Sequence, residues 1–152
     1  MIAEQIFSAA NALAMAGWLL LVLYFVIGER FALLQRIVEG YWIPLFLSLC
    51  YAVVMGLLVS GILPGAEGGF SSIQGVRSLF ESDFALLGGW IHYLAFDLFV
   101  GSVVGQAARR EGISILWMLP VWFLTFMFGP VGYALWRLVK VLTRKKGLEA
   151  SV

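Results

Sequence analysis

The chain has 152 residues, of which 62% are hydrophobic and only 12% are charged. Soluble domains contain about 45–50% apolar and about 25% charged residues, and a chain of this length buries only about 70% of its surface. A soluble enzyme, a disulfide-stabilised scaffold and a disordered chain are therefore excluded or nearly so. The net charge of +1 argues against a partner nucleic acid, and the single cysteine, Cys50, permits no internal disulfide.

Ionisable residues separate four long apolar stretches of the chain. Each exceeds the roughly 20 helical residues that cross a ~30 Å hydrocarbon core, and none alternates apolar with polar residues as a barrel strand does. We therefore predict an all-α, polytopic membrane protein, folded as a single membrane domain with a bundle of four transmembrane helices. The predicted spans cover about 8–28, 42–63, 84–107 and 115–137, and a basic C-terminal tail follows at 138–152.

The first apolar stretch does not resemble a signal peptide, because Glu4 precedes it, no basic residue does, and its apolar run is too long. We predict that it stays in the mature chain. Four spans place both termini on one side of the membrane. Six lysine and arginine residues lie on that side and four on the other, which favours cytoplasmic termini. The expected location is the cytoplasmic (inner) membrane if the source is bacterial, with the lipid bilayer as surroundings.

The second loop, Pro64 to Asp83, opens with one proline and several glycines, which interrupt helices. Hydrophobic residues then recur every three or four positions, which predicts a short interfacial amphipathic helix between spans two and three. These residues are Phe70, Ile73, Val76, Leu79 and Phe80. The helix either anchors the chain as it re-enters the membrane or forms a lid over a lipid-facing pocket, and the anchor is favoured.

Asp97 is the strongest candidate for a functional residue, because it lies near the middle of the third predicted span. An ionised carboxylate there costs at least about 2.5–3.5 kcal/mol, so we expect Asp97 to be largely protonated at neutral pH. Gly101 and Gly105 share its helix face and form a G-x-x-x-G pair, which allows close approach of another helix. We therefore expect Asp97 to face the bundle, and a homo-oligomer through the two glycines stays open.

Two roles for Asp97 stay open. Folding the chain about the 109–114 loop sets Thr125 opposite Asp97, and Pro130 deprives the carbonyl of Phe126 of its helical hydrogen bond. A protonated Asp97 that donates to either residue would hold the third span against a kinked fourth span. In the other role, Asp97 is a buried proton donor or acceptor.

The other polar and aromatic residues of the spans support two interpretations each. His92 lies five residues before Asp97, about 140° round the helix, which argues against a simple dyad on one face. We expect no metal site, because Cys50, His92 and Asp97 are not expected to converge. Asn11 either bonds a neighbouring helix or contacts a substrate. Deep aromatic residues either pack helices together or line a slot for a long apolar ligand, and they include Trp90, Tyr93, Phe96 and Phe126.

A string in the third span, GWIHYLAFDLFVG from Gly89 to Gly101, is followed by Pro120 and by FGPVG from Phe128 to Gly132. This arrangement resembles the abscisic acid-deficient 4-like family of small four-span membrane proteins. Asn11 and Trp18 are also similar to the first span of that family. The resemblance covers most of the chain in the same order.

The resemblance implies carotenoid or isoprenoid chemistry, because plant members are implicated in neoxanthin synthesis. That reaction is a redox-neutral isomerisation of an epoxide to an allene, so it needs an acid at the oxygen, a base near a C–H bond and no cofactor. On this interpretation Asp97 and His92 are catalytic. The substrate would contact Asn11, Trp90, Tyr93, Phe96, Thr125, Phe126 and Pro130. The alternative is a non-enzymatic membrane protein that binds pigment or packs against a membrane partner.

Overall fold

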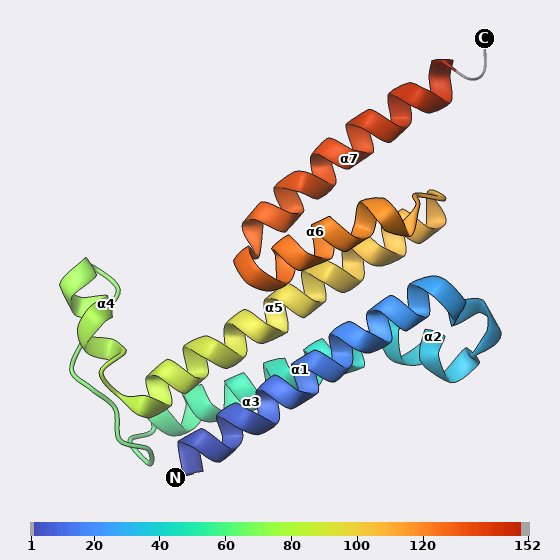
Figure 1. Cartoon of the computed structure of the whole chain (residues 1–152). Coiled ribbons are helices and arrows are strands. Elements are labelled where there is room, and N and C mark those ends of the chain that lie inside the picture. Colours follow the sequence, from blue (N-terminus) through green and yellow to red (C-terminus); the bar gives the residue numbers. More distant parts are fainter. Residues whose placement is uncertain (1, 150–152) are drawn as a thin grey trace. The chain divides into compact units, whose positions relative to one another are not determined.

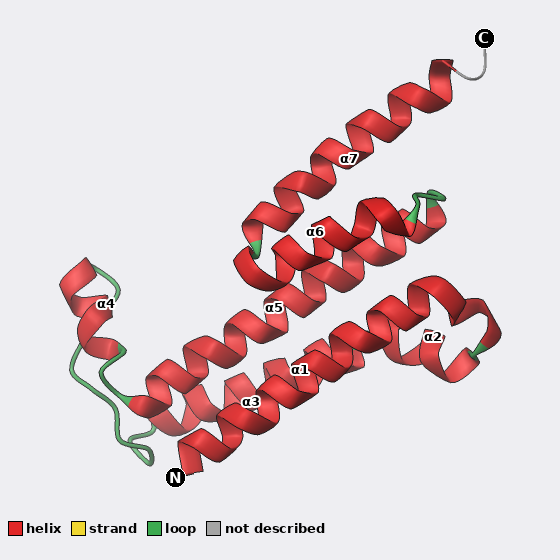
Figure 2. Ribbon diagram, viewed as in Figure 1, coloured by secondary structure: helices red, strands yellow, loops and turns green. Residues whose placement is uncertain are grey.

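The computed structural model describes residues 2–149, with the side chains of Glu29 and of residues 144–149 left out. The described residues form helices and no strand (Figure 1, Figure 2), which confirms the all-α class. In chain order the elements are α1 (Ile2–Ile27), the 3-10 turn η1 (Gly28–Arg30), α2 (Ala32–Glu39), α3 (Trp42–Val59), α4 (Ile73–Leu79), α5 (Asp83–Arg110), α6 (Ile115–Phe128) and α7 (Pro130–Glu149). The end of the predicted basic tail, 150–152, lies outside the described residues.

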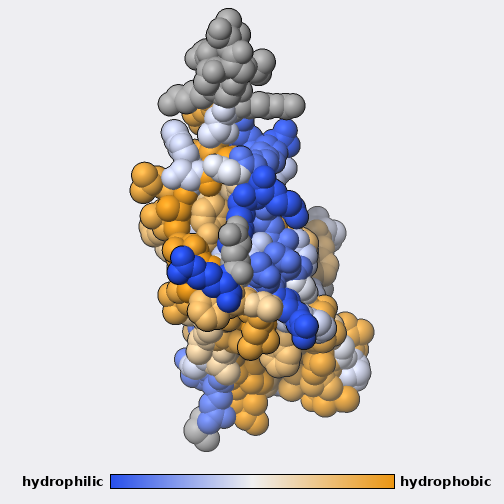
Figure 3. All heavy atoms as spheres, turned by 90° about the vertical axis from the view of Figure 1, so that its right-hand side faces the viewer, coloured by the Kyte–Doolittle hydropathy of each residue, from blue (hydrophilic) through white to orange (hydrophobic). Residues whose placement is uncertain are grey.

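Three stretches are long and apolar enough to cross a membrane: α1, α5, and Ala32–Val59, which comprises α2 and α3. In the apolar 18-residue window of each stretch, only 33% of the residues are buried in α1, 44% in α5 and 17% in Ala32–Val59. Hydrophobic residues accordingly cover large areas of the face seen in Figure 3. Soluble monomers rarely expose apolar patches of this extent, and the hydrocarbon of a bilayer would cover them, as in an integral membrane protein.

The fourth predicted span, 115–137, is not one continuous helix. The chain breaks at Gly129, which separates α6 from α7. Gly129 has φ +41° and ψ −89°, a backbone conformation that glycine adopts far more easily than other residues. Pro130 follows as the first residue of α7, where its missing N–H costs no helical hydrogen bond. The sequence analysis predicts a fourth span that is kinked at Pro130, whereas the structure breaks the helix there. A count of four complete spans is not confirmed.

Helices α6 and α7 form an antiparallel hairpin, with α7 running back along α6 (Figure 1). Near the break, Gly132 lies so close to the backbone of Thr125 that a Cβ atom would not fit. At the other end, Lys140 of α7 binds Glu111, which follows α5, at 2.6 Å. The 14 residues of α6 extend only roughly 20 Å, short of a ~30 Å hydrocarbon core. We therefore interpret α6 and α7 as a hairpin that enters and leaves on one side.

The chain divides into two compact units, the first made of Met1–Ala16 with Ile43–Ala95 and the second of Gly17–Trp42 with Phe96–Val152. The first unit buries apolar residues of α1, α3 and α5, among them Ala14, Leu47 and Ile91. The second buries others of the same kind, including Leu21, Leu98, Met118, Val121 and Val139. Each unit therefore buries apolar residues of its own, and the single membrane domain stays a prediction.

The helix predicted between spans two and three is present as α4. None of its residues is buried, and Ile73 is 82% exposed. The ring of Phe80, just after α4, packs on α5 so closely that a Cβ atom on Gly89 would lie 2.7 Å from it. The hydroxyl of Ser82 donates to the carbonyl of Pro64 at 2.7 Å and closes the loop. These contacts favour the anchor over the lid.

The hairpin favours an orientation other than the predicted one with both termini in the cytoplasm. If α1, α3 and α5 are the complete crossings, the termini face opposite sides of the membrane. Nine of the ten lysine and arginine residues then share the C-terminal side: two in the first loop, two at the end of α5 and five from Arg137 onward. Only Arg77 lies on the other side, so we predict a cytoplasmic C-terminus and an external N-terminus.

Reporter fusions test this orientation. A reporter at the C-terminus should give a cytoplasmic signal, and one inserted in the 64–72 loop should give an external signal, because α5 separates the two positions. If both reporters signalled from the same side, α6 and α7 would have to complete a fourth crossing.

Candidate functional site

Asp97 lies at the middle of α5, and only 8% of the residue is exposed. Its carboxyl packs against the break of the hairpin, where a Cβ atom on Gly129 would lie 2.7 Å from Oδ1. Gly129 is itself buried. The structure thus sets a buried acid beside non-helical backbone, and it confirms that Asp97 points into the protein.

The helix break offers a backbone partner to either protonation state of Asp97. Helix α6 ends at Phe128, and carbonyl groups of a last helical turn accept hydrogen bonds from a protonated carboxyl. Helix α7 starts at Pro130, and the positive end of its dipole stabilises a carboxylate. A carboxyl placed beside both helix ends can therefore release a proton and take it back in the same position.

Two tryptophans cover the face of α5 that carries Gly101 and Gly105, in the turns that follow Asp97. The indole of Trp18 packs on Gly101 too closely for a Cβ atom there, and it meets the ring of Phe126 edge-on at 5.9 Å. Trp122 donates from Nε1 to the carbonyl of Gly101 at 3.0 Å and also covers Gly105. Where the sequence predicts close approach of another helix, indole side chains of the same chain cover the two glycines. A second copy would have to displace them to use this face.

Thr125 and Pro130 contribute to the hairpin itself. Thr125 is fully buried, and its hydroxyl donates to the carbonyl of Val121 within α6 at 2.8 Å. Its backbone carbonyl accepts from the N–H of Gly129 at 2.9 Å and so closes the last turn of α6. Pro130 is exposed and begins α7. Both residues shape the turn at Gly129 between α6 and α7, which is the hairpin tip and faces Asp97.

Other predicted site residues gather in the first unit. Trp90 of α5 donates from Nε1 to Oδ1 of Asn11 in α1 at 3.2 Å, which is the interhelical bond expected of this asparagine. The Trp90 ring lies 5.5 Å from Phe7 and 5.4 Å from Tyr93, measured between centroids. A groove of about 450 Å³ runs beside this cluster, lined by Ala3, Glu4, Phe7, Asp83, Leu86, Leu87 and Trp90.

His92 and Phe96 lie on the surface of α5. His92 is exposed, and its ring centroid lies 5.3 Å from that of Tyr51 in α3. Phe96 is 58% exposed. The uninterrupted helix α5 keeps His92 and Asp97 on different faces, as their spacing predicts. Among the described residues, no group of three histidine, cysteine or acidic side chains could hold a metal ion.

A polar cluster at the end of α5 was missed by the sequence analysis. Arg109 donates to the backbone carbonyl of Tyr24 near the end of α1, and its guanidinium lies 4.8 Å from the Tyr24 ring. The Tyr24 hydroxyl donates to Glu39 of α2 at 2.8 Å. Gln106 donates to the carbonyl of Val38 at 3.2 Å. The sequence assigned no role to these residues, which join α1, α2 and α5.

Residues 5–136 match the profile of the family described as ABA DEFICIENT 4-like. The chain belongs to the ABA DEFICIENT 4-like family. The match confirms the resemblance seen in the sequence, and it includes Asn11, Asp97 and the hairpin tip of this ABA DEFICIENT 4-like protein. No curated protein and no solved structure matches the chain.

We predict that Gly129→Ala destabilises this ABA DEFICIENT 4-like protein strongly. The new Cβ would clash with Asp97 Oδ1, and φ +41° is strained for a residue with a side chain. Gly61→Ala is the matched control, because Gly61 has φ +73° and nothing within 4 Å of its Cβ position. That control should lose only the backbone strain, about 1–3 kcal/mol.

Thermal unfolding in detergent measures both effects. Gly129→Ala should lower Tm more than Gly61→Ala, and its additional loss should shrink in an Asp97→Ala background, because contacting residues are not additive. Equal losses for the two alanine variants would contradict a tight contact between Asp97 and the tip.

Proposed function

We propose that this protein binds a long isoprenoid lipid of the carotenoid class in the cytoplasmic membrane and isomerises it by acid–base chemistry. The observation that carries the proposal is the buried carboxyl of Asp97 beside the hairpin tip. Non-helical backbone at membrane depth is tolerated only where protein or a cavity covers it, and intramembrane acids are functional candidates by default. Membership of the ABA DEFICIENT 4-like family supports the carotenoid class.

The proposed reaction converts an epoxide into an allenic alcohol without oxidation or reduction. Protonated Asp97 donates its proton to the epoxide oxygen as the C–O bond breaks, and the polyene delocalises the resulting positive charge. The carboxylate then removes a proton from a neighbouring carbon, whose C–H electrons form the new double bond. Substrate and product have the same composition, and Asp97 ends protonated as it began.

The remaining predicted residues have supporting roles in this proposal. The aromatic surface of Phe7, Trp90 and Tyr93 suits the ring and polyene of a carotenoid, and the adjacent groove falls within the ~300–1,000 Å³ of typical ligand sites. His92 is proposed as a second proton-transfer group. The other predicted substrate contacts, Asn11, Phe96, Thr125, Phe126 and Pro130, stay predictions.

The tight packing of Asp97 favours a second candidate function. A carboxyl that is 8% exposed and in contact with Gly129 also serves to hold α5 against the hairpin. In that case the protein binds pigment or a membrane partner without turnover, and Asp97 acts through the helix contact alone.

Asp97→Asn separates the two candidates. The amide keeps the size and hydrogen-bonding capacity of the carboxyl but transfers no proton, so we expect at least about a 10²-fold loss of conversion of a carotenoid epoxide, with pigment binding retained. Glu67→Gln, at an exposed residue of the loop between α3 and α4, is the matched control and should convert at the parental rate. Conversion by Asp97→Asn at the parental rate refutes the proposed chemistry, and a parental protein that holds pigment without turnover establishes the second candidate.

A further inference from the structure

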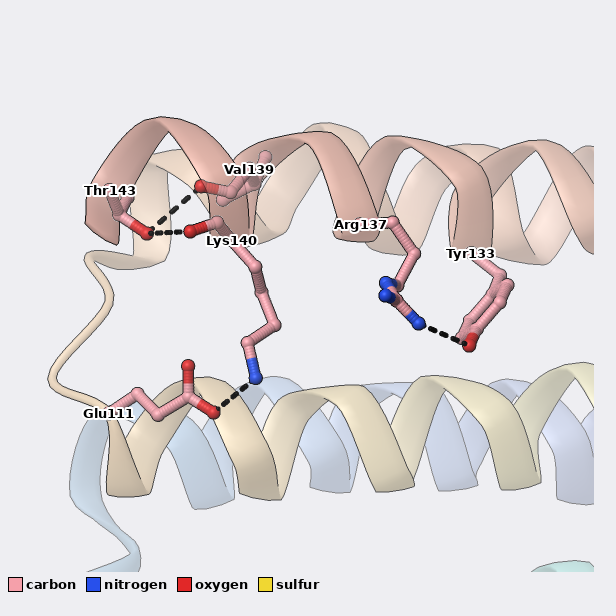
Figure 4. A network of polar contacts seen from close by, with 6 residues as sticks. All are labelled: Glu111, Tyr133, Arg137, Val139, Lys140 and Thr143. Atoms are coloured by element: carbon pink, nitrogen blue, oxygen red, sulfur yellow. Dashed lines mark hydrogen bonds and ion pairs between the residues drawn. The ribbon is translucent and has the colours of Figure 1, made fainter. Parts of the chain in front are cut away.

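A polar groove of about 640 Å³ lies in the second unit, where the loop from α5 to α6 faces α7. It differs from the apolar surface of the helices, because two charged side chains, two hydroxyl groups and an indole line it. Its lining residues are Glu111, Gly112, Ile113, Ser114, Trp117, Lys140 and Thr143. Figure 4 shows Lys140 extending from α7 to Glu111, whereas Arg137 bonds to Tyr133 of the same helix.

The groove lies at the depth of lipid headgroups. The loop that lines it ends one membrane-crossing helix and begins the hairpin, so it marks the boundary between hydrocarbon and water. Trp117, in the first turn of α6, is 41% exposed, and tryptophan is enriched at this boundary. A lipid whose headgroup occupied the groove would have its acyl chains beside the apolar surface of the hairpin.

The charges in the groove match a zwitterion rather than a simple anion. Lys140 Nζ lies 2.6 Å from Glu111 Oε1, with 38% and 42% of the two side chains exposed. An ammonium group has three donors and a carboxylate two oxygens, so each can bind a further partner of opposite charge. Arg137, three residues before Lys140 on α7, does not line the groove and donates to the Tyr133 hydroxyl at 3.5 Å. Exposed ion pairs contribute little to folding, so stability alone does not explain this arrangement.

We propose that this groove binds the headgroup of a phospholipid that carries a primary amine, such as phosphatidylethanolamine. Its phosphate binds Lys140, and its ammonium group donates to Glu111. A choline headgroup has no N–H to donate to the carboxylate, and a glycerol headgroup leaves Glu111 beside an uncompensated phosphate. The site involves no residue assigned to the isomerisation, so it does not rest on the proposed function.

The test is binding of short-chain phospholipids to the purified full-length protein in detergent. Phosphatidylethanolamine should bind at least about threefold more tightly than phosphatidylcholine or phosphatidylglycerol. Lys140→Ala should weaken binding of all three by up to about tenfold, because a charge-assisted contact is lost. Glu111→Gln should abolish the preference for ethanolamine over glycerol. Both side chains are exposed, so the variants should keep the parental Tm.

Arg77→Ala, which removes an exposed arginine of α4, is the matched control and should bind like the parent. Equal binding of the three phospholipids, or tighter binding of phosphatidylglycerol, overturns the proposal in favour of unspecific attraction to the basic side. A loss of phospholipid binding in Arg77→Ala as large as that in Lys140→Ala also overturns the proposal. Free phosphoethanolamine that binds as tightly as the lipid would identify a soluble ligand instead.

Discussion

The contact between the carboxyl of Asp97 and the bare backbone of Gly129 determines the architecture of the second unit. Only a residue without a side chain fits beside Oδ1, and the same residue takes the positive φ that reverses the chain. The reversal sends α7 back along α6, and this brings Lys140 to Glu111. The position of the acid, the shape of the hairpin and the polar groove at its open end therefore depend on one glycine.

Helix α5 connects the elements of this unit through polar contacts spaced along its length. Lipid tails are as apolar as leucine, so burial of apolar surface does little to select one helix pairing over another in a membrane. Small residues and hydrogen bonds supply that selection. The contacts of α5 are Asp97 with Gly129 at the hairpin tip, the Gly101 carbonyl with Trp122 of α6, Gln106 with Val38 of α2, and Arg109 with Tyr24 of α1.

The sequence predicted those features that depend on local composition. Long apolar stretches located α1, α3 and α5, and the angular position of Asp97 on a helix predicted its burial. The hairpin was missed because no charge interrupts the chain between Gly112 and Trp136, so hydropathy continues across the break. Whether a Gly-Pro pair kinks or reverses a helix depends on the close approach of Gly132 to Thr125, which is a tertiary contact. Helix α2 was missed because it is short and mixes polar with apolar residues.

The two proposed sites of the second unit are connected by one short helical segment. Only the residues from Pro130 to Val139 separate the hairpin tip from Lys140, and ten helical residues extend roughly 15 Å. A headgroup that joins Glu111 to Lys140 would hold this segment against the end of α5. Because the segment is rigid, the same headgroup would also keep Gly129 on Asp97. A bound phospholipid would thus stabilise the geometry of the buried acid from the membrane surface, and its acyl chains would lie in the hydrocarbon layer from which the proposed isoprenoid substrate would come.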